Sequence, residues 1–201
     1  MNNYEYIVAS LPDISLSRSG VDSVDTSAII ADIINLCSDK DKGTINLLLE
    51  GFDDKTLGEA FYRKALDSSD NFVRQYFTYD LHMRNMKARY VNRALGRKDD
   101  TDIFMADGKE YDSDSRLSAL FGSGDVLALE KGLDALLWET VDEINVFQYF
   151  SLDSILGFIV KLHIVSRWLS LDPESGKEMF SKLVKEVTAT YSSARDASGI
   201  F

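Results

Sequence analysis

Hydrophobic residues recur at helical spacing along most of the chain, and the densest run lies at residues 152–171. The run is apolar around most of its circumference, which is typical of a helix buried on all sides. Ser151 precedes it as a predicted N-cap, and Asp153 follows in the first turn, where the helix dipole favours negative charge. Lys161, His163 and Arg167 interrupt the run before it reaches the roughly 20 residues of a membrane span. We therefore predict a buried central helix, around which the other helices pack.

The same periodicity predicts seven further helices, so the fold class that we expect is all-α. Gly96 stands where a glycine ends a helix, and Asp172-Pro173 opens the last helix, whose apolar stripe runs from Phe180 to Tyr191. Residues Tyr4–Leu11 are too short for periodicity to decide between a strand and a helix. The predicted helices cover residues 27–37, 45–52, 55–66, 71–95, 115–121, about 125–145, and from 172 until the pattern fades at 192.

A short motif occurs twice, at residues 75–80 and 148–153. Gln75-Tyr76-Phe77-Thr78-Tyr79-Asp80 matches Gln148-Tyr149-Phe150-Ser151-Leu152-Asp153, with Thr in place of Ser at the predicted N-cap. Self-similarity at a fixed offset suggests a duplicated unit. It predicts two related multi-helix lobes, 1–98 and 115–201, joined by an acidic connector at 99–114. The alternative is that a favourable helix start arose twice.

Composition narrows the class of protein. Among 201 residues there are 2 prolines and 12 glycines, which favours long helices. The single cysteine, Cys37, excludes an internal disulfide and fits a reducing compartment. The N-terminus lacks the basic and apolar regions of a signal peptide, and no window is long and apolar enough to span a membrane. We therefore expect a cytoplasmic protein.

Charge is distributed unevenly, around one basic helix. The net charge is −11, which argues against general nucleic-acid binding, yet residues 74–98 hold seven basic residues and one acid, Asp80. Asp80 and Arg84 form a favourable i, i+4 pair, and Lys87 requires another acid from this protein or from a partner. A helical wheel places Phe77, Leu81, Ala88, Val91 and Leu95 on the apolar side, and Arg74, His82, Asn85, Arg89, Asn92 and Arg93 on the opposite arc.

Two interpretations of this basic helix stay open. Its basic face is a surface for a charged partner, for which the candidate residues are Arg74, Arg89, Arg93 and Arg97. Alternatively, the face is solvated and neutralised by the protein's own acids at 99–114.

No motif predicts a catalytic residue, a cofactor or a metal ligand. Residues 39–45 fail as a calcium loop because the glycine and the final glutamate are misplaced, and a polar turn between helices explains them better. Gly122-Ser123-Gly124 lacks the lysine and the preceding strand of a phosphate loop, so we interpret it as a hinge before a cap at Asp125. His82 and His163 have no ligand-spaced partner, and His163 fits a core position.

Several stretches resemble the central-stalk socket protein of V-type and archaeal-type rotary ATPases, which bears the letter C, or d in eukaryotes. Residues 149–156 resemble that family's aromatic-Phe-Ser-hydrophobic-acidic helix start, and residues 80–89 resemble its acidic-Leu-x-x-x-Asn-hydrophobic-Lys helix. Residues 3–9 resemble its aromatic-rich start. More specifically, residues 6–14 are similar to the start of the uncharacterised family that bacterial V-type ATPase operons encode at the place of this socket protein. The usual socket protein has three repeated lobes, whereas this chain has room for two.

The resemblance implies a non-catalytic coupling subunit, without nucleotide or cofactor of its own, in a complex that moves ions or makes ATP. Its partners would be the central-stalk and membrane rotor-ring subunits, and it would touch the cytoplasmic membrane only through them. The alternatives are an unrelated helical adaptor and a nucleic-acid-binding regulator that uses the basic helix 74–98.

Overall fold

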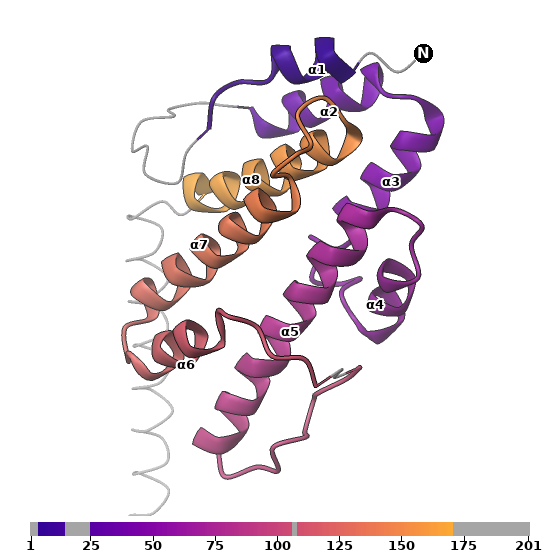
Figure 1. Cartoon of the computed structure of the whole chain (residues 1–201). Helices are drawn as coiled ribbons and strands as arrows, with labels where there is room; N and C mark the ends of the chain where they lie inside the picture. Colours follow the sequence, from indigo (N-terminus) through magenta and orange to yellow (C-terminus); the bar gives the residue numbers. More distant parts are fainter. Residues whose placement is uncertain (1–3, 15–24, 106–107, 171–201) are drawn as a thin grey trace, which may run out of the picture. The chain divides into compact units, whose positions relative to one another are not determined.

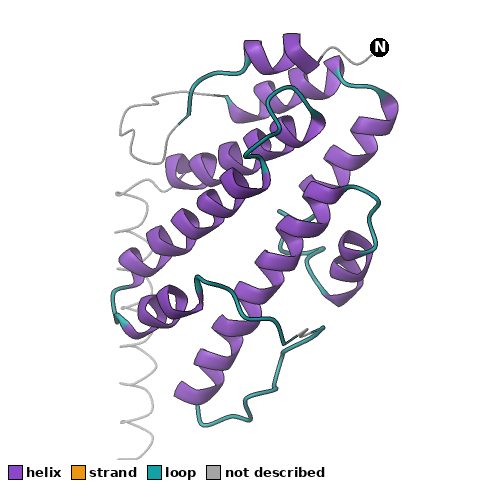
Figure 2. Ribbon diagram, in the orientation of Figure 1, coloured by secondary structure: helices purple, strands orange, loops and turns teal. Residues whose placement is uncertain are grey.

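The computed structural model describes residues 4–14, 25–105 and 108–170, which form eight α-helices and no strand (Figures 1 and 2). The predicted all-helical fold class is confirmed. The segment at Tyr4, left open between strand and helix, is helical. The helices are α1 (Tyr4–Ser10), α2 (Thr26–Leu36), α3 (Asp39–Glu50), α4 (Glu59–Leu66), α5 (Asn71–Ala94), α6 (Asp114–Gly122), α7 (Val126–Ile144) and α8 (Leu152–Ser170).

Polar side chains fix where four of these helices begin. Asp25, Ser38, Asp70 and Asp125 each accept a hydrogen bond from a backbone N–H in the first turn of the helix that follows. The cap at Asp125 and the left-handed glycine after α5, Gly96 with φ +64°, are as predicted.

The prediction of a polar turn at residues 39–45 is wrong, because these residues form the first two turns of α3. The Oγ of Ser38 accepts from the backbone N–H of Asp41 at 3.3 Å, and Asp39 and Asp41 lie at the positive end of the helix dipole. Capping therefore outweighs the low helix propensity of Gly43, which lies inside the helix.

Helix α5 is where the other helices meet, since it packs against α4, α6 and α7. In Figure 1, α4 lies on one side of α5, and α6 and α7 lie on the other. The α6–α7 side buries a hydrophobic cluster of Tyr79, Met83, Leu117, Phe121, Leu133 and Leu136. The predicted central helix, α8, is indeed buried from Ile155 to Val160, but α5 makes the larger set of helix contacts.

The α4 side of α5 is filled by aromatic rings. The ring of Phe77 meets Phe61 edge-on at 4.8 Å between centroids and Tyr76 at 5.0 Å. Gly51, at the end of α3, lies directly against them: a Cβ at this position would come within 2.3 Å of Phe77 and 2.6 Å of Phe61. A residue without a side chain is therefore required for this close packing.

Helices α7 and α8 form a hairpin with very little space between them. A Cβ at Gly157 of α8 would lie 2.0 Å from Nδ2 of Asn145 and 3.0 Å from Cγ1 of Val141. One turn further along, Lys161 pairs with Asp142 and lies 4.7 Å above the ring of Trp138. The connection between the two helices, residues 146–151, is consequently held at both ends.

Neither predicted N-cap of the repeated motif acts as one. The Oγ of Ser151 is buried and has no hydrogen-bond partner among the described residues, while the hydroxyl of Ser154 donates to the carbonyl of Gln148. Thr78 lies two turns inside α5, which Asp70 caps, and donates to the carbonyl of Arg74. The motif therefore occupies a helix interior in one place and a loop in the other.

Within the proposed acidic connector, 99–114, residues 99–105 run back along α5 (Figure 1) and are tied to it. The side-chain amides of Asn85 and Asn92 donate to the carbonyls of Phe104 at 3.0 Å and Thr101 at 2.7 Å. The described residues up to Ile164 belong to one compact unit, and Val165 begins a second. The division into two related lobes stays a prediction, and the helix expected from residue 172 lies outside the described residues.

Within the described ranges, no helix combines the length and the hydropathy that crossing a membrane requires.

Candidate functional site

The C-terminal half of α5 and the residues that follow it carry an unbroken run of positive charge. Residues 84–98, which we name the basic end, contain six lysines and arginines and no acid. Among them, Tyr90, Val91 and Leu95 are 44%, 40% and 59% exposed. The basic end therefore exposes both hydrocarbon and positive charge.

The predicted faces of α5 are partly wrong at this end. Val91 and Leu95 were expected to pack inward, but they are exposed, whereas Asn85 and Asn92, expected on the polar arc, are only 5% and 2% exposed. The reason is that the returning segment covers the asparagine face and satisfies both amides with backbone carbonyls. A helical wheel assigns the inward face by hydrophobicity and cannot anticipate a loop that binds polar side chains.

The charges nearest the middle of α5 are satisfied within the protein. The buried carboxylate of Asp80 accepts hydrogen bonds from the Tyr62 hydroxyl and from Nε of Arg84 at 2.9 Å, which confirms the predicted i, i+4 pair. Burial and the neighbouring Asp80 charge raise the pKa of Tyr62, so its hydroxyl stays a donor. Lys87 finds the acid it was expected to need in Glu130 of α7, with N···O 3.7 Å.

The four predicted partner-binding arginines occupy two different environments. Arg93 and Arg97 are exposed on the basic end, where the Arg93 guanidinium donates twice to Asp99 at 2.9 and 3.0 Å. This hydrogen-bonded pair lowers the pKa of the Asp99 carboxyl. Arg74 and Arg89 are half-buried and line a cleft instead. The structure therefore does not bring all four together on one outer surface, and their role in partner binding stays a prediction.

The cleft has a volume of about 790 Å³ and lies between α5, α6, α7, Met105 and residues 108–113. Its charged lining is mixed: Arg74, Arg89, Lys109 and Arg116 face it together with Asp112, Glu139 and Glu143. Arg116 and Glu139 form a two-point ion pair across α6 and α7, with N···O distances of 2.6 and 3.0 Å. Positive and negative groups therefore largely balance at this cleft.

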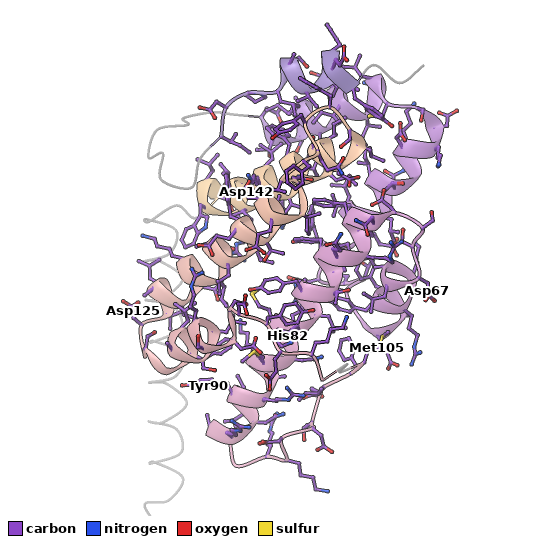
Figure 3. The ribbon with its side chains drawn as sticks, viewed as in Figure 1. Asp67, His82, Tyr90, Met105, Asp125 and Asp142 are labelled. Carbon is purple, nitrogen blue, oxygen red and sulfur yellow. The ribbon has the colours of Figure 1, made fainter. Side chains whose placement is uncertain are left out.

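A histidine–carboxylate pair ties the wall of the cleft together. Nε2 of His82 lies 2.6 Å from Oδ1 of Asp114, whose other oxygen accepts from the backbone N–H of Tyr111 at 3.1 Å. The imidazole lies 4.4 Å from the ring of Tyr111, and Figure 3 shows His82 pointing from α5 toward α6. The nearby Tyr79 hydroxyl donates a hydrogen bond to Oγ of Ser113 at 2.9 Å, and burial raises the pKa of Tyr79. These hydrogen bonds and ring contacts hold residues 111–114 against α5.

A second exposed surface lies at the end of the α5–α7 pair opposite the basic end. Residues 146–150, which we name the aromatic loop, connect α7 to α8 and expose Val146 (55%), Phe147 (82%), Tyr149 (69%) and Phe150 (58%). Helices α5 and α7 run in opposite directions (Figure 1), so the aromatic loop and the basic end lie at opposite ends of this pair. In Figure 3, Asp142 and Tyr90 mark these two ends.

The sequence on both sides of the aromatic loop is acidic. Between Lys131 and Lys161 the sequence holds five acids and no lysine or arginine. At the start of α8, burial, followed by the charge of Asp70, raises the pKa of Asp153. Asp142 is paired with Lys161 and Glu139 with Arg116, and Asp134 is 2% exposed, so most of this negative charge is neutralised or buried within the protein.

Sequence reasoning missed this loop because it assigned Tyr149 and Phe150 to the start of a buried helix. Val146, Phe147, Tyr149 and Phe150 are four large apolar residues in five, but positions 146, 149 and 150 have the i, i+3, i+4 spacing of a helix, so the pattern alone did not mark them as an exposed loop. Asn85 and Asn92 are seven residues apart, which places both on one face of α5.

The structure gives the fold class of this protein, and the sequence comparisons give its family. The described part is an all-helical unit, in which no three His, Cys, Asp or Glu side chains gather closely enough to hold a metal ion. Residues 53–190 match the family described as "Protein of unknown function (DUF2764)", and the chain belongs to this family. The match begins just after α3 and includes α4 to α8. No curated protein and no solved structure matches the chain.

Proposed function

We propose that this protein is a non-catalytic coupling subunit of a V-type ATPase or ATP synthase, which links the central stalk to the membrane rotor ring. The proposal rests on the resemblance of residues 80–89 and 149–156 to the socket protein of that complex. In this role the chain would be peripheral to the cytoplasmic membrane and would reach it only through its partners.

The observation that carries the proposal is the basic end of α5. Five of its six cationic residues are exposed, whereas Arg89 lines the cleft, and three apolar side chains are exposed along the same end of the helix. The net charge of the whole chain is −11. A protein partner that is acidic and apolar would match both features, because complementary charge speeds and orients association while buried hydrocarbon supplies affinity. The surface is thus suited to hold another protein rather than a small substrate.

The test is affinity purification of the chain from its native membranes in mild detergent, with mass spectrometry of the proteins that co-elute. Wild type is expected to recover stalk, catalytic and ring subunits. The variant R89E/R93E is expected to lose most of the stalk subunits and to keep its helical circular dichroism spectrum, since Arg93 is exposed and Arg89 half-buried.

A matched control is R63E/K64E on α4. It makes the same change of charge at two residues whose side chains are 63% and 57% exposed and whose ion pairs lie away from the basic end. This control should bind as wild type does. If wild type recovers none of the ATPase subunits at low salt from membranes that contain the intact complex, the proposal is wrong. Equal loss in both variants would point to net charge rather than to this surface.

A further inference from the structure

The chain occupies part of its own basic end. Gly96, with φ +64°, reverses the chain after α5, and Asp99 then lies beside Arg93. Nε and Nη2 of Arg93 both donate to the same carboxylate oxygen of Asp99, Oδ2, at 3.0 and 2.9 Å. The second oxygen, Oδ1, takes no part in this pair. The two-oxygen geometry in which a guanidinium and a carboxylate bind most strongly is therefore not formed.

The ion pair of Arg116 and Glu139 has that stronger geometry. Two guanidinium nitrogens there each donate to a different carboxylate oxygen, at 2.6 and 3.0 Å. The side chains of Arg93 and Asp99 are also 69% and 56% exposed, and an exposed ion pair contributes little to stability. A carboxylate from another protein can therefore form a better pair with Arg93 than Asp99 does, at little cost to the fold.

The returning segment, residues 99–105, has an unfavourable backbone conformation. Among the described residues, Asp102 and Met105 are the non-glycine residues with positive φ, at +60° and +49°, and both lie in this segment. The left-handed conformation is uncommon for residues with a side chain, and surrounding contacts must enforce it. Backbone strain of this kind is typical of segments that change conformation when a ligand binds.

The attachment of this segment to α5 is polar at its start, whereas further on it packs against a ring of α4. The carbonyl of Thr101 accepts a hydrogen bond from the buried Asn92 amide at 2.7 Å, and the ring of Phe104 lies 5.6 Å from that of Tyr62. Lifting residues 99–101 would expose an amide and a carbonyl, which water can satisfy. Lifting Phe104 would expose hydrocarbon and would cost more. The segment can therefore open at its start and stay attached at Phe104.

We propose that Asp99 is an internal substitute for a partner's carboxylate, and that an acidic partner displaces it from Arg93 and lifts residues 99–101 from α5. That this partner is the stalk rests on the proposed function, but the exchange at Arg93 does not. The two interpretations of the basic helix are then combined. The protein's own acid neutralises Arg93 in the free protein, and the partner's acid neutralises it in the complex. A partner without an acidic group at this position gains nothing from the exchange, so the exchange favours acidic partners.

The experiment is an NMR titration of the full chain with hexaglutamate, which stands for the acidic partner, and with purified stalk subunits. D99N leaves Arg93 without its internal carboxylate, so the affinity for hexaglutamate is expected to rise about two- to fivefold at low salt. The gain should disappear in about 1 M salt, where the screening length is only about 3 Å. In wild type, binding of the peptide should speed hydrogen exchange of the backbone amides at residues 99–103.

Two further variants test whether Asp99 acts through Arg93. D112N makes the same change of charge at an exposed acid that lines the cleft instead, and it should bind hexaglutamate as wild type does. In an R93Q background, D99N should bring no further gain, because the guanidinium for which the two carboxylates compete is absent. The melting temperature of D99N is expected to stay within a few degrees of wild type, since the pair is exposed.

The outcomes separate this inference from the proposed function. A lower melting temperature of D99N without a gain in affinity would show that the pair is structural and would overturn the inference. Equal gains in D99N and D112N would also overturn it, because net charge would explain both, and so would a gain that persists in R93Q. If D99N gains affinity for hexaglutamate but no variant binds the stalk subunits, the exchange at Arg93 stands and the coupling role fails. If the stalk subunits bind but D99N changes neither affinity, the coupling role stands and the exchange fails.

Discussion

Two segments of this chain share Gln, Tyr, Phe and Asp in the same order, and the fold uses them in opposite ways. In the first, Tyr76 and Phe77 are 4% and 1% exposed inside α5. In the second, Tyr149 and Phe150 are 69% and 58% exposed in the aromatic loop. The same pair of rings is core in one place and surface in the other.

The difference lies in what each motif meets. Because Asp70 starts α5 ahead of the motif, Tyr76 and Phe77 fall inside the helix, and α4 supplies Phe61 and Tyr62 to pack against them. Helix α8 starts only at Leu152, so Tyr149 and Phe150 precede it and remain exposed. Similar local sequence therefore predicts similar local preference, but burial depends on whether another element covers it. The second copy is exposed because no described element packs over its rings.

The largest expected difference between the two copies of the motif appears when one ring is removed from each. Phe77→Ala is expected to lower the free energy of unfolding by about 3–5 kcal/mol, because it leaves a cavity among Phe61, Tyr76 and Gly51. Phe150→Ala should change it by less than about 0.5 kcal/mol, since that ring is already hydrated. Urea unfolding of the two variants measures both, and a loss of similar size at Phe150 would show that the loop is part of the core.

The aspartates of the two motifs sharpen the comparison because their substitutions should differ in sign. Asp80→Asn is expected to destabilise the protein by about 2 kcal/mol, since the Asp80 carboxylate holds both the Tyr62 hydroxyl and Arg84. Asp153→Asn is expected to stabilise it slightly, on the order of 0.5 kcal/mol after allowance for solvent screening. The reason is that burial, and after it the charge of Asp70, disfavours the ionised form of Asp153.

The pH dependence of stability provides a separate test of the Asp153→Asn prediction. A carboxyl whose pKa is raised by folding costs stability when ionised, and that cost disappears as pH falls through the folded pKa. The advantage of Asp153→Asn should therefore be full at neutral pH and vanish below the ordinary aspartate value of 3.8. An advantage that persists at pH 3, measured by thermal unfolding of both proteins, would contradict this explanation.

The smallest expected effect concerns the hydroxyl of Ser151. A true N-cap costs about 1 kcal/mol when changed to alanine, but the Ser151 Oγ has no hydrogen-bond partner among the described residues. Ser151→Ala should therefore be neutral or slightly stabilising in thermal unfolding. Asp125→Ala is the matched positive control, since Asp125 accepts from the N–H groups of Leu127 and Ala128. A loss at Ser151 as large as that at Asp125 would restore the capping role.

Periodicity and caps predicted the helical class, the ends of α5 and α7 and the burial of α8, because these depend on residues close in sequence. The misassigned faces of α5 depend on contacts that sequence spacing does not contain. Asn92 is buried only because Thr101 returns to it. Likewise, the basic residues were visible as a run, but their division between an outer surface and a cleft required the positions of α6 and α7.

The tight crossing at Gly157 has a mechanical consequence. Where a glycine leaves no free space between two helices, the hairpin has no slack through which it can bend. Movement of the rings at its tip would therefore be passed on to α7, which forms ion pairs with α5 through Lys87 and with α6 through Arg116. A larger residue at position 157 would have to displace the Asn145 side chain and press on Val141, so this crossing depends on the absence of a side chain at Gly157.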